Sequence, residues 1–269
     1  ASLLFGILAE KMQRTTMLCS LTSRMLSTIR VPGALLVGHI PALRPSSFQM
    51  RGMAFMKNPK ESHNPLKKEL QHPSKFVENK RRLQRRDFIL VHQYEEQREQ
   101  FINEIAMPMQ EKRLLTVSPD LGIVFTNYDL IWFKLQELYR FEGGNESLLS
   151  EEIEDFGRYL PRGHELVGCC FQDPGAAKEP TELQAVADGL HTLLLTFQGQ
   201  EVACEPVTGF LHDDHGMFQV YVRWTLTEEQ SEALRSSSDA MLKLAEKKGG
   251  MLAETSIPSR TLEEIVTDL

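Results

Sequence analysis

Apolar residues at helical spacing predict helices in the middle of the chain. The first covers Tyr94–Lys112, where Pro108 bends or ends it because proline lacks the amide proton a helix needs. Asn127 is placed to cap a second helix through "YDLIWFKLQELYRFE", which "GGN" then stops. A third covers Ser147–Leu160 and ends at Pro161.

Two capping-box patterns and a terminal motif predict the remaining helices. Thr181-x-x-Gln184 and Thr227-x-x-Gln230 place a hydroxyl and an amide at the spacing that satisfies the first free amides of a helix. Pro258 with Ser259 opens a short helix near the end of the sequence.

Short apolar runs separated by turn residues predict strands in local pairs. The expected strands are 114–117, 123–126, 164–172, 193–197, 202–205 and 217–225. Segments 240–245 and 251–257, around Gly249 and Gly250, fit either a hairpin or a broken helix. Because the strands pair locally instead of alternating with helices, we expect a single α+β domain. It should hold an antiparallel or mixed sheet with helices packed mainly on one face.

The N-terminal part of the chain has the composition of an organelle presequence. No Asp or Glu occurs from Met12 to Lys60, while Arg, Ser, Thr and Leu recur. A cationic amphipathic helix of this kind directs import into mitochondria, and the alternative is a disordered basic tail on a cytosolic protein. We predict a mitochondrial presequence over 1–56, a basic linker or docking arm over 57–86, an acidic α+β domain over 87–269 and a mitochondrial-matrix location.

Charge separates the arm from the domain. Residues 87–269 hold 14 basic and 33 acidic residues, a net charge of −19, so nucleic acid should not bind the acidic domain. The arm, with "KRRLQRR" at Lys80–Arg86, could instead lie on an acidic or RNA surface of a larger assembly. No apolar stretch reaches the roughly 18 residues of a membrane span.

One block of motifs resembles a known family. It consists of Arg98, "FTNYDLIWFKLQELYR" with Gln136-Glu137 and Arg140, then Glu152-Ile153, Leu160-Pro161 and Glu165-Leu166. Over about residues 86–269 the chain resembles the uncharacterised bacterial family DUF3501. Genes of that family often lie near those of rubrerythrin-like proteins and iron–sulfur oxidoreductases, which implies a place beside redox or peroxide chemistry. The resemblance assigns no catalytic residue.

The helix after Asn127 carries polar and aromatic residues at i, i+3 and i+4 spacing, which could line a pocket. Carboxylates that meet in such a pocket could bind a metal or exchange protons. The alternative is a partly buried face in which Glu137 and Arg140 are paired. The candidate binding residues are Asp129, Trp132, Gln136, Glu137, Arg140, Glu152 and Glu165.

The run "HDDH" holds metal-ligand residue types at His212, Asp213 and His215. Neighbouring residues of an extended segment point apart, so a solvated turn is the favoured interpretation and no stoichiometric metal is expected. No cofactor is assigned. The usual nucleotide-binding, hydrolase and zinc-protease motifs do not occur in the sequence.

Three functions follow as hypotheses. The first is an accessory or binding protein of a redox system linked to iron–sulfur or peroxide metabolism. The second is a structural accessory subunit of a large mitochondrial assembly, a respiratory complex or the ribosome, attached through the arm. The third is a carboxylate-based metal-dependent enzyme. The first two make protein partners an expectation, either redox proteins or a mitochondrial assembly, whereas the sequence leaves the oligomeric state open.

Overall fold

A computed structural model describes residues 72–77, 79–118, 121–172, 182–207, 211–212 and 218–269. These residues form an α+β fold with two antiparallel sheets, which confirms the predicted class. The predicted helix at Thr181-x-x-Gln184 begins outside the described residues at Thr181 and is seen as α7 (Glu182–Ala187).

The first sheet has the order β1-β2-β3-β8-β6, with β7 also paired to β8, and each neighbouring pair is antiparallel. Its strands are β1 (Leu114–Thr116), β2 (Leu121–Phe125), β3 (Glu165–Gln172), β6 (Glu205–Pro206), β7 (Leu211–His212) and β8 (Phe218–Thr225). The paired strands β1 and β2, and β7 and β8, are close in the sequence, whereas β2 with β3 and β3 with β8 join distant segments.

The second sheet has the order β10-β9-β4-β5 and is also antiparallel. Its strands are β4 (His191–Phe197), β5 (Gln200–Ala203), β9 (Met241–Glu246) and β10 (Met251–Ser256). Segment 240–257, which the sequence left open, is therefore a hairpin, with Gly249 at a positive φ of 102° in its turn.

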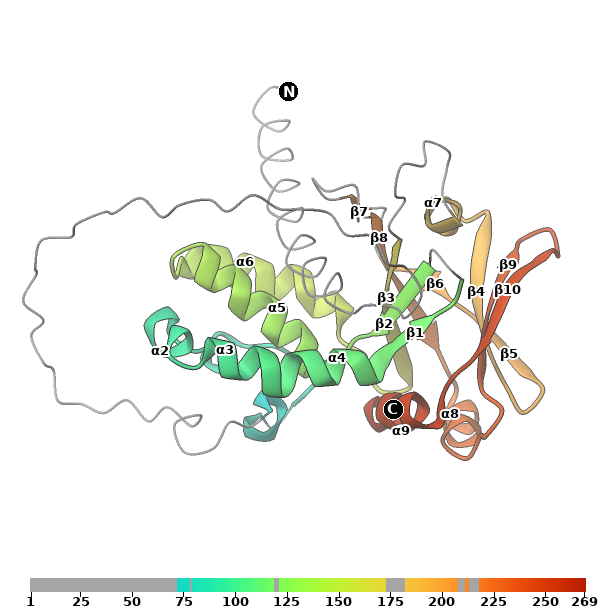
Figure 1. Ribbon diagram of the computed structural model, residues 1–269, viewed down its shortest axis with the longest axis horizontal. Helices are drawn as coiled ribbons and strands as arrows, with labels where there is room; N and C mark the ends of the chain where they lie inside the picture. The colour runs from blue at the N-terminus through green and yellow to red at the C-terminus, as the bar shows by residue number, and fades with distance from the viewer. Residues whose placement is uncertain (1–71, 78, 119–120, 173–181, 208–210, 213–217) are drawn as a thin grey trace, which may run out of the picture.

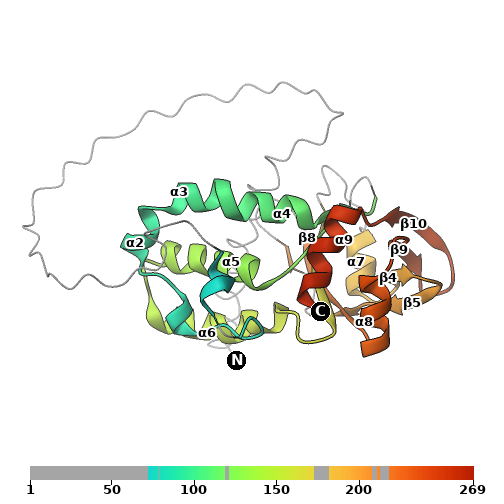
Figure 2. The ribbon, with the colours of Figure 1, turned by 90° about the horizontal axis from the view of Figure 1, so that it is seen from below.

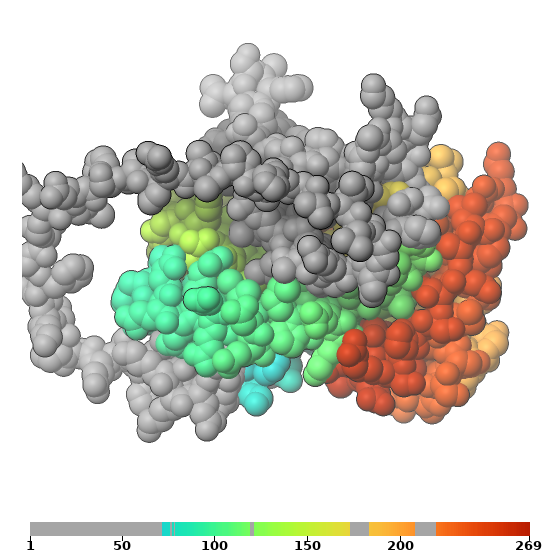
Figure 3. Space-filling view, in the orientation of Figure 1, coloured from blue at the N-terminus to red at the C-terminus, as the bar shows by residue number. Residues whose placement is uncertain are grey.

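Most of the helices lie together on one side of the first sheet, away from the second (Figures 1 and 2). This layer consists of α2 (Val91–Glu95), α3 (Arg98–Phe101), α4 (Met107–Arg113), α5 (Tyr128–Phe141) and α6 (Glu146–Phe156). Helices α7, α8 (Glu228–Arg235) and α9 (Ser259–Ile265) lie beside the two sheets instead. In the space-filling view the α2–α4 segment and the C-terminal helices adjoin on one face (Figure 3).

Alternation along the central strands creates two cores. Cys170 of β3 and Trp224 of β8 point into the core between the sheets, whereas Cys169 and Tyr221 point into the core under the helices. The Trp224 indole also donates a 3.1 Å hydrogen bond to the carbonyl of Leu193 in β4, which links the two sheets directly. Burial raises the pKa of both cysteine thiols, so neither thiol is activated.

The helix predicted over 94–112 is interrupted just before Pro108. Residues Ile102–Ala106 form one π-helical turn between α3 and α4, and Pro108 is in the first turn of α4. A π turn shifts the hydrogen-bond register, and this compensates for the donor that proline lacks. The predicted start at Tyr94 also differs from the structure, because Tyr94 lies in a separate short helix, α2, that ends at Glu95.

Gly168 is a position in β3 where the neighbouring strands leave no room for a side chain. A Cβ atom there would lie 2.5 Å from Cδ1 and 2.8 Å from Cγ1 of Ile123, with the Trp224 ring at 3.4 Å. We expect Gly168→Ala to lower the free energy of unfolding by about 1–3 kcal/mol through overpacking, as measured by urea denaturation. Gly157→Ala is the matched control, since nothing lies within 4 Å of its added methyl group. Equal stability of the two variants would contradict this account.

Candidate functional site

The polar and aromatic residues predicted to share one side of α5, called the predicted stripe below, mainly pack against the segment before α2. Trp132 is 1% exposed, and its indole donates a 2.7 Å hydrogen bond to the carbonyl of Asp87. Gln136 is fully buried, and its amide accepts from the backbone N–H of Ile89 at 2.9 Å and donates to the Ile89 carbonyl at 3.0 Å. Both side chains thus bond partly buried backbone groups of the segment before α2.

Glu137 is the centre of an ion-pair network. Its carboxylate, 2% exposed, accepts from the Arg98 guanidinium at 2.7, 2.8 and 3.1 Å and lies 3.4 Å from Nε of Arg140. Arg140 also reaches the exposed Glu95 at 3.2 Å. The pairing of Glu137 with Arg140, weighed as the alternative to a pocket, is therefore present in the structure, and Arg98 supplies the stronger contact.

Asp129 holds the segment that precedes the helical layer. Its carboxylate accepts from the Ser74 backbone N–H at 2.6 Å and from the Ser74 hydroxyl at 2.8 Å, and His72 Nδ1 lies 3.4 Å away. Ser74 belongs to the short 3-10 helix η2 (Pro73–Phe76). Asp129 also occupies the first turn of α5, where the helix dipole favours a negative charge.

The two other predicted carboxylates lie on different elements. Glu165, at the start of β3, accepts from the backbone N–H of Arg162 at 3.0 Å and lies 3.4 Å from the Arg223 guanidinium. Glu152 lies on α6 and is half-buried. Within the described residues, no three His, Cys, Asp or Glu side chains come close enough to hold a metal ion.

The "HDDH" run is only partly described. His212 lies in β7, whose backbone pairs with Phe218 of β8. Asp213 and His215 lie outside the described residues, so the interpretation of this run as a solvated turn stays a prediction.

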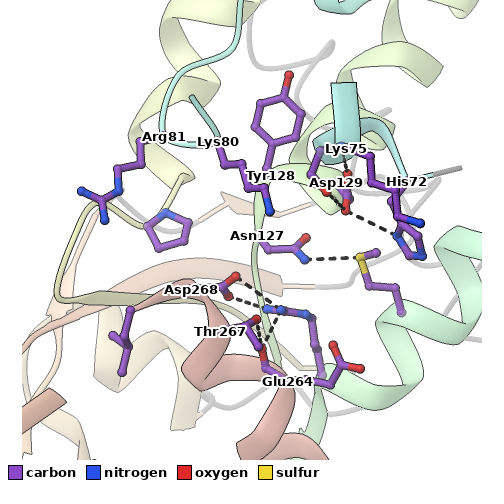
Figure 4. Close-up of a pocket in the computed structure, with 15 residues that line it drawn as sticks. His72, Lys75, Lys80, Arg81, Asn127, Tyr128, Asp129, Glu264, Thr267 and Asp268 are labelled. Carbon is purple, nitrogen blue, oxygen red and sulfur yellow. Dashed lines mark hydrogen bonds and ion pairs between the residues drawn. The ribbon is translucent and has the colours of Figure 1, made fainter. Parts of the chain in front are cut away.

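One member of the predicted stripe, Asp129, lines a pocket (Figure 4). The pocket has a volume of about 420 Å³ and lies where η2, the end of α4, the start of α5 and the segment after α9 meet. Its lining includes a buried amide, Asn127, which caps α5 by accepting from the Leu130 N–H at 2.9 Å. The only acceptor for the Asn127 Nδ2 among the described residues is the Met109 sulfur at 3.4 Å, and thioethers accept hydrogen bonds weakly.

The acidic wall of the pocket is neutralised from within the protein. Arg113, whose side chain is 2% exposed, donates to Asp268 at 2.6 and 3.4 Å and to the Glu264 carbonyl at 2.9 Å. Burial raises the pKa of the Asp268 carboxyl, and the Arg113 guanidinium opposes that effect. The Glu264 carboxylate is paired with Lys112 at 3.0 Å.

The opposite rim carries cations without such partners. Lys75, Lys80 and Arg81 all line the pocket and are exposed. Among the described residues, none of the three has a carboxylate within ion-pair distance. Figure 4 shows Lys80 extending into the pocket and Arg81 along its edge. The pocket therefore has a paired acidic wall and an unpaired basic rim.

Sequence reasoning placed these three cations in the arm and did not connect them to Asp129. The described end of that arm packs on the helical layer, because Leu83 is buried and the Arg85 guanidinium binds Glu146 of α6. Arg85 and the Tyr139 hydroxyl together lower the pKa of Glu146 to about 2. One signal in the sequence could have shown that the arm packs on the domain, since the apolar Leu83 lies within the basic run Lys80–Arg86 and Phe88 follows it.

None of the helices in the described part of the chain combines the length and apolar character needed to cross a bilayer. Fold and site together define an α+β protein with a charged pocket between its helical layer and its C-terminal segment. The chain belongs to the family described as Protein of unknown function (DUF3501), which matches residues 82–269. The resemblance inferred from the sequence is thereby confirmed.

A solved structure shares the fold. It is the crystal structure of a novel protein of unknown function from Burkholderia pseudomallei K96243, with 15% sequence identity and a TM-score of 0.55. The alignment covers 70% of this chain and 98% of that one. No curated protein matches the sequence.

Proposed function

We propose that this chain is an accessory or binding protein of a redox system linked to iron–sulfur or peroxide metabolism, located in the mitochondrial matrix. The redox assignment rests on membership of the DUF3501 family, whose bacterial genes often lie beside those of rubrerythrin-like proteins and iron–sulfur oxidoreductases. The location rests on the acid-poor N-terminal sequence.

The geometry supports binding more than catalysis. Glu137, the most buried carboxylate of the predicted stripe, has both oxygens occupied by Arg98, and Asp129 is held by Ser74. Carboxylates with these partners are positioned to stabilise the fold. The pocket next to Asp129 is the feature that offers a ligand unpaired groups, and it is the observation that carries a binding role.

The location makes a direct prediction. A reporter fused to residues 1–60 should accumulate in mitochondria. Replacing Arg14, Arg24 and Arg30 with Glu should abolish import, because it reverses the charge on which the membrane potential acts. Fluorescence microscopy with a matrix marker checks both results, and a cytosolic signal from the unaltered fusion would exclude a matrix location.

The redox role is tested in cells that lack the protein. Their isolated mitochondria should clear hydrogen peroxide more slowly or lose activity of iron–sulfur enzymes, and the full chain should restore the defect. The chain with the three Arg→Glu changes should not restore it, since it would not be imported. Normal peroxide clearance together with normal iron–sulfur enzyme activity would reject the redox proposal.

The exposed cations of the arm favour a second candidate, a structural accessory subunit of a large mitochondrial assembly. Lys80, Arg81, Arg82 and Arg86 are all exposed and would face an acidic partner surface. Native gels of mitochondrial extracts decide this candidate. A subunit would migrate with a complex far above the 30.7 kDa of the full chain, whereas migration as a free monomer or dimer would exclude it.

A further inference from the structure

We propose that the pocket between η2, α5 and the segment after α9 binds a small molecule that carries several negative charges on phosphate or carboxylate groups. The inference stands on the pocket itself and holds whether or not the redox assignment is correct. Its volume of about 420 Å³ lies within the range of sites for small molecules.

The first argument is the charge that remains after internal pairing. Two side-chain carboxylates of the lining are ion-paired, Asp268 with Arg113 and Glu264 with Lys112, and Asp129 accepts hydrogen bonds from the uncharged Ser74. These contacts leave the ammonium groups of Lys75 and Lys80 and the guanidinium of Arg81 unpaired among the described residues. Three unpaired cations against the single carboxylate of Asp129 still leave a positive side-chain charge in the described lining, although residues 87–269 as a whole are strongly acidic.

The second argument is a buried donor inside the pocket. Asn127 is 9% exposed, and of its two amide protons at most one is directed at the Met109 sulfur. A ligand oxygen would be a much better acceptor than a thioether. Arg113 is in the same lining, and its buried Nε has no hydrogen-bond partner in the described part of the chain.

The third argument is the direction in which the ligand must lie. Lys75, Lys80 and Arg81 belong to the segment before the helical layer, whereas Asp268 lies after α9 on the other side of the pocket (Figure 4). An anionic group would be stabilised next to the lysines, whereas Asp268, already bound by Arg113, offers it no favourable contact. The ligand should therefore place its charged groups against Lys80 and Arg81, with hydroxyl or other neutral polar groups towards Asn127 and Asp268.

Calorimetric titration of the full chain with pyrophosphate and, separately, with citrate tests the proposal. At least one of the two should bind with a stoichiometry of about one, and the affinity should fall as sodium chloride is added. Pyrophosphate binding alone would assign phosphate groups to the natural ligand, and citrate binding alone would assign carboxylates. If neither anion binds, the proposal is wrong.

A matched pair of variants separates the pocket from general charge. Lys80→Ala with Arg81→Ala should weaken binding about tenfold or more, since two charge-assisted contacts are lost. Lys247→Ala with Lys248→Ala removes two adjacent exposed cations in the turn between β9 and β10, and should leave the affinity within about twofold. Equal losses in the two double variants would overturn the assignment to this pocket.

A charge-conserving exchange provides the rescue. Lys80→Arg with Arg81→Lys keeps both cations on the rim, so it should retain most of the affinity that the double alanine variant loses. Thermal unfolding of every variant should give the same midpoint, because both side chains are exposed. Unchanged affinity in the double alanine variant would also reject the proposal.

Discussion

Replacing Arg113 with methionine should lower the free energy of unfolding by about 3–5 kcal/mol, because it breaks one side of a buried ion pair. The Arg113 side chain is 2% exposed, and its guanidinium donates to both Asp268 oxygens and to the Glu264 carbonyl. Methionine fills much of the volume but leaves the Asp268 carboxylate, 15% exposed, without a cation.

Lys112→Met is the matched control, since the neighbouring Lys112 is 48% exposed and its partner Glu264 is 32% exposed. An exposed pair of this kind contributes less than about 1 kcal/mol. Urea denaturation followed by tryptophan fluorescence measures both variants, because Trp132 and Trp224 are buried. Similar losses for Lys112→Met and Arg113→Met would contradict a special role for the buried pair.

The effect of Arg113→Met should also depend on pH. Burial raises the pKa of Asp268, so ionising this carboxyl costs stability in the folded state. That cost is absent below the ordinary aspartate pKa of about 4 and grows as the pH rises through the folded pKa. Without the arginine the cost is larger, so the stability deficit of the variant should be greater at neutral pH than in acid.

The sequence predicted the features that depend on neighbouring residues. The Asn127 cap of α5 is confirmed, as is the capping box of Thr227 and Gln230, in which each side chain bonds the backbone of the other residue. Such signals need only three or four consecutive positions. The same holds for the β1–β2 hairpin, whose turn residues follow directly on the apolar run.

Features that depend on distant residues could not be predicted. The pairing of β3 with β8 joins residues that are 46 to 60 positions apart, and nothing in one sequence specifies which strands become neighbours. Because β3 pairs with β8, β4 pairs with β9 in a second sheet, and the single sheet expected from the sequence becomes two. The sequence predicted the strand 217–225 that contains Trp224, but not that Trp224 contacts Leu193 of another strand.

In the candidate site, too, the sequence predicted what depends on neighbouring residues and missed what depends on distant ones. The spacing on α5 placed Gln136 and Glu137 on a common face, and both are buried there. Their partners, Ile89 and Arg98, lie about 40 or more positions earlier, so periodicity could not show that packing occupies both side chains. The pocket beside Asp129 combines four separate segments, η2, the end of α4, the start of α5 and the segment after α9, and only the fold brings them together.

Glu137→Gln should lower the free energy of unfolding by about 3 kcal/mol, since it removes the anion from a buried pair while keeping the size of the side chain. Glu137 is 2% exposed and bound to Arg98, which is 30% exposed and keeps some contact with water. Glu95→Gln is the control. It is the same chemical change at another partner of Arg140, but Glu95 is 49% exposed, so the loss should stay below about 1 kcal/mol.

Urea denaturation with elemental analysis of each purified protein distinguishes this structural role from the metal-dependent enzyme considered for the same residue. Loss of a bound metal from Glu137→Gln with unchanged stability would favour the enzyme, whereas a large loss of stability places Glu137 in the framework that holds α5 against α3.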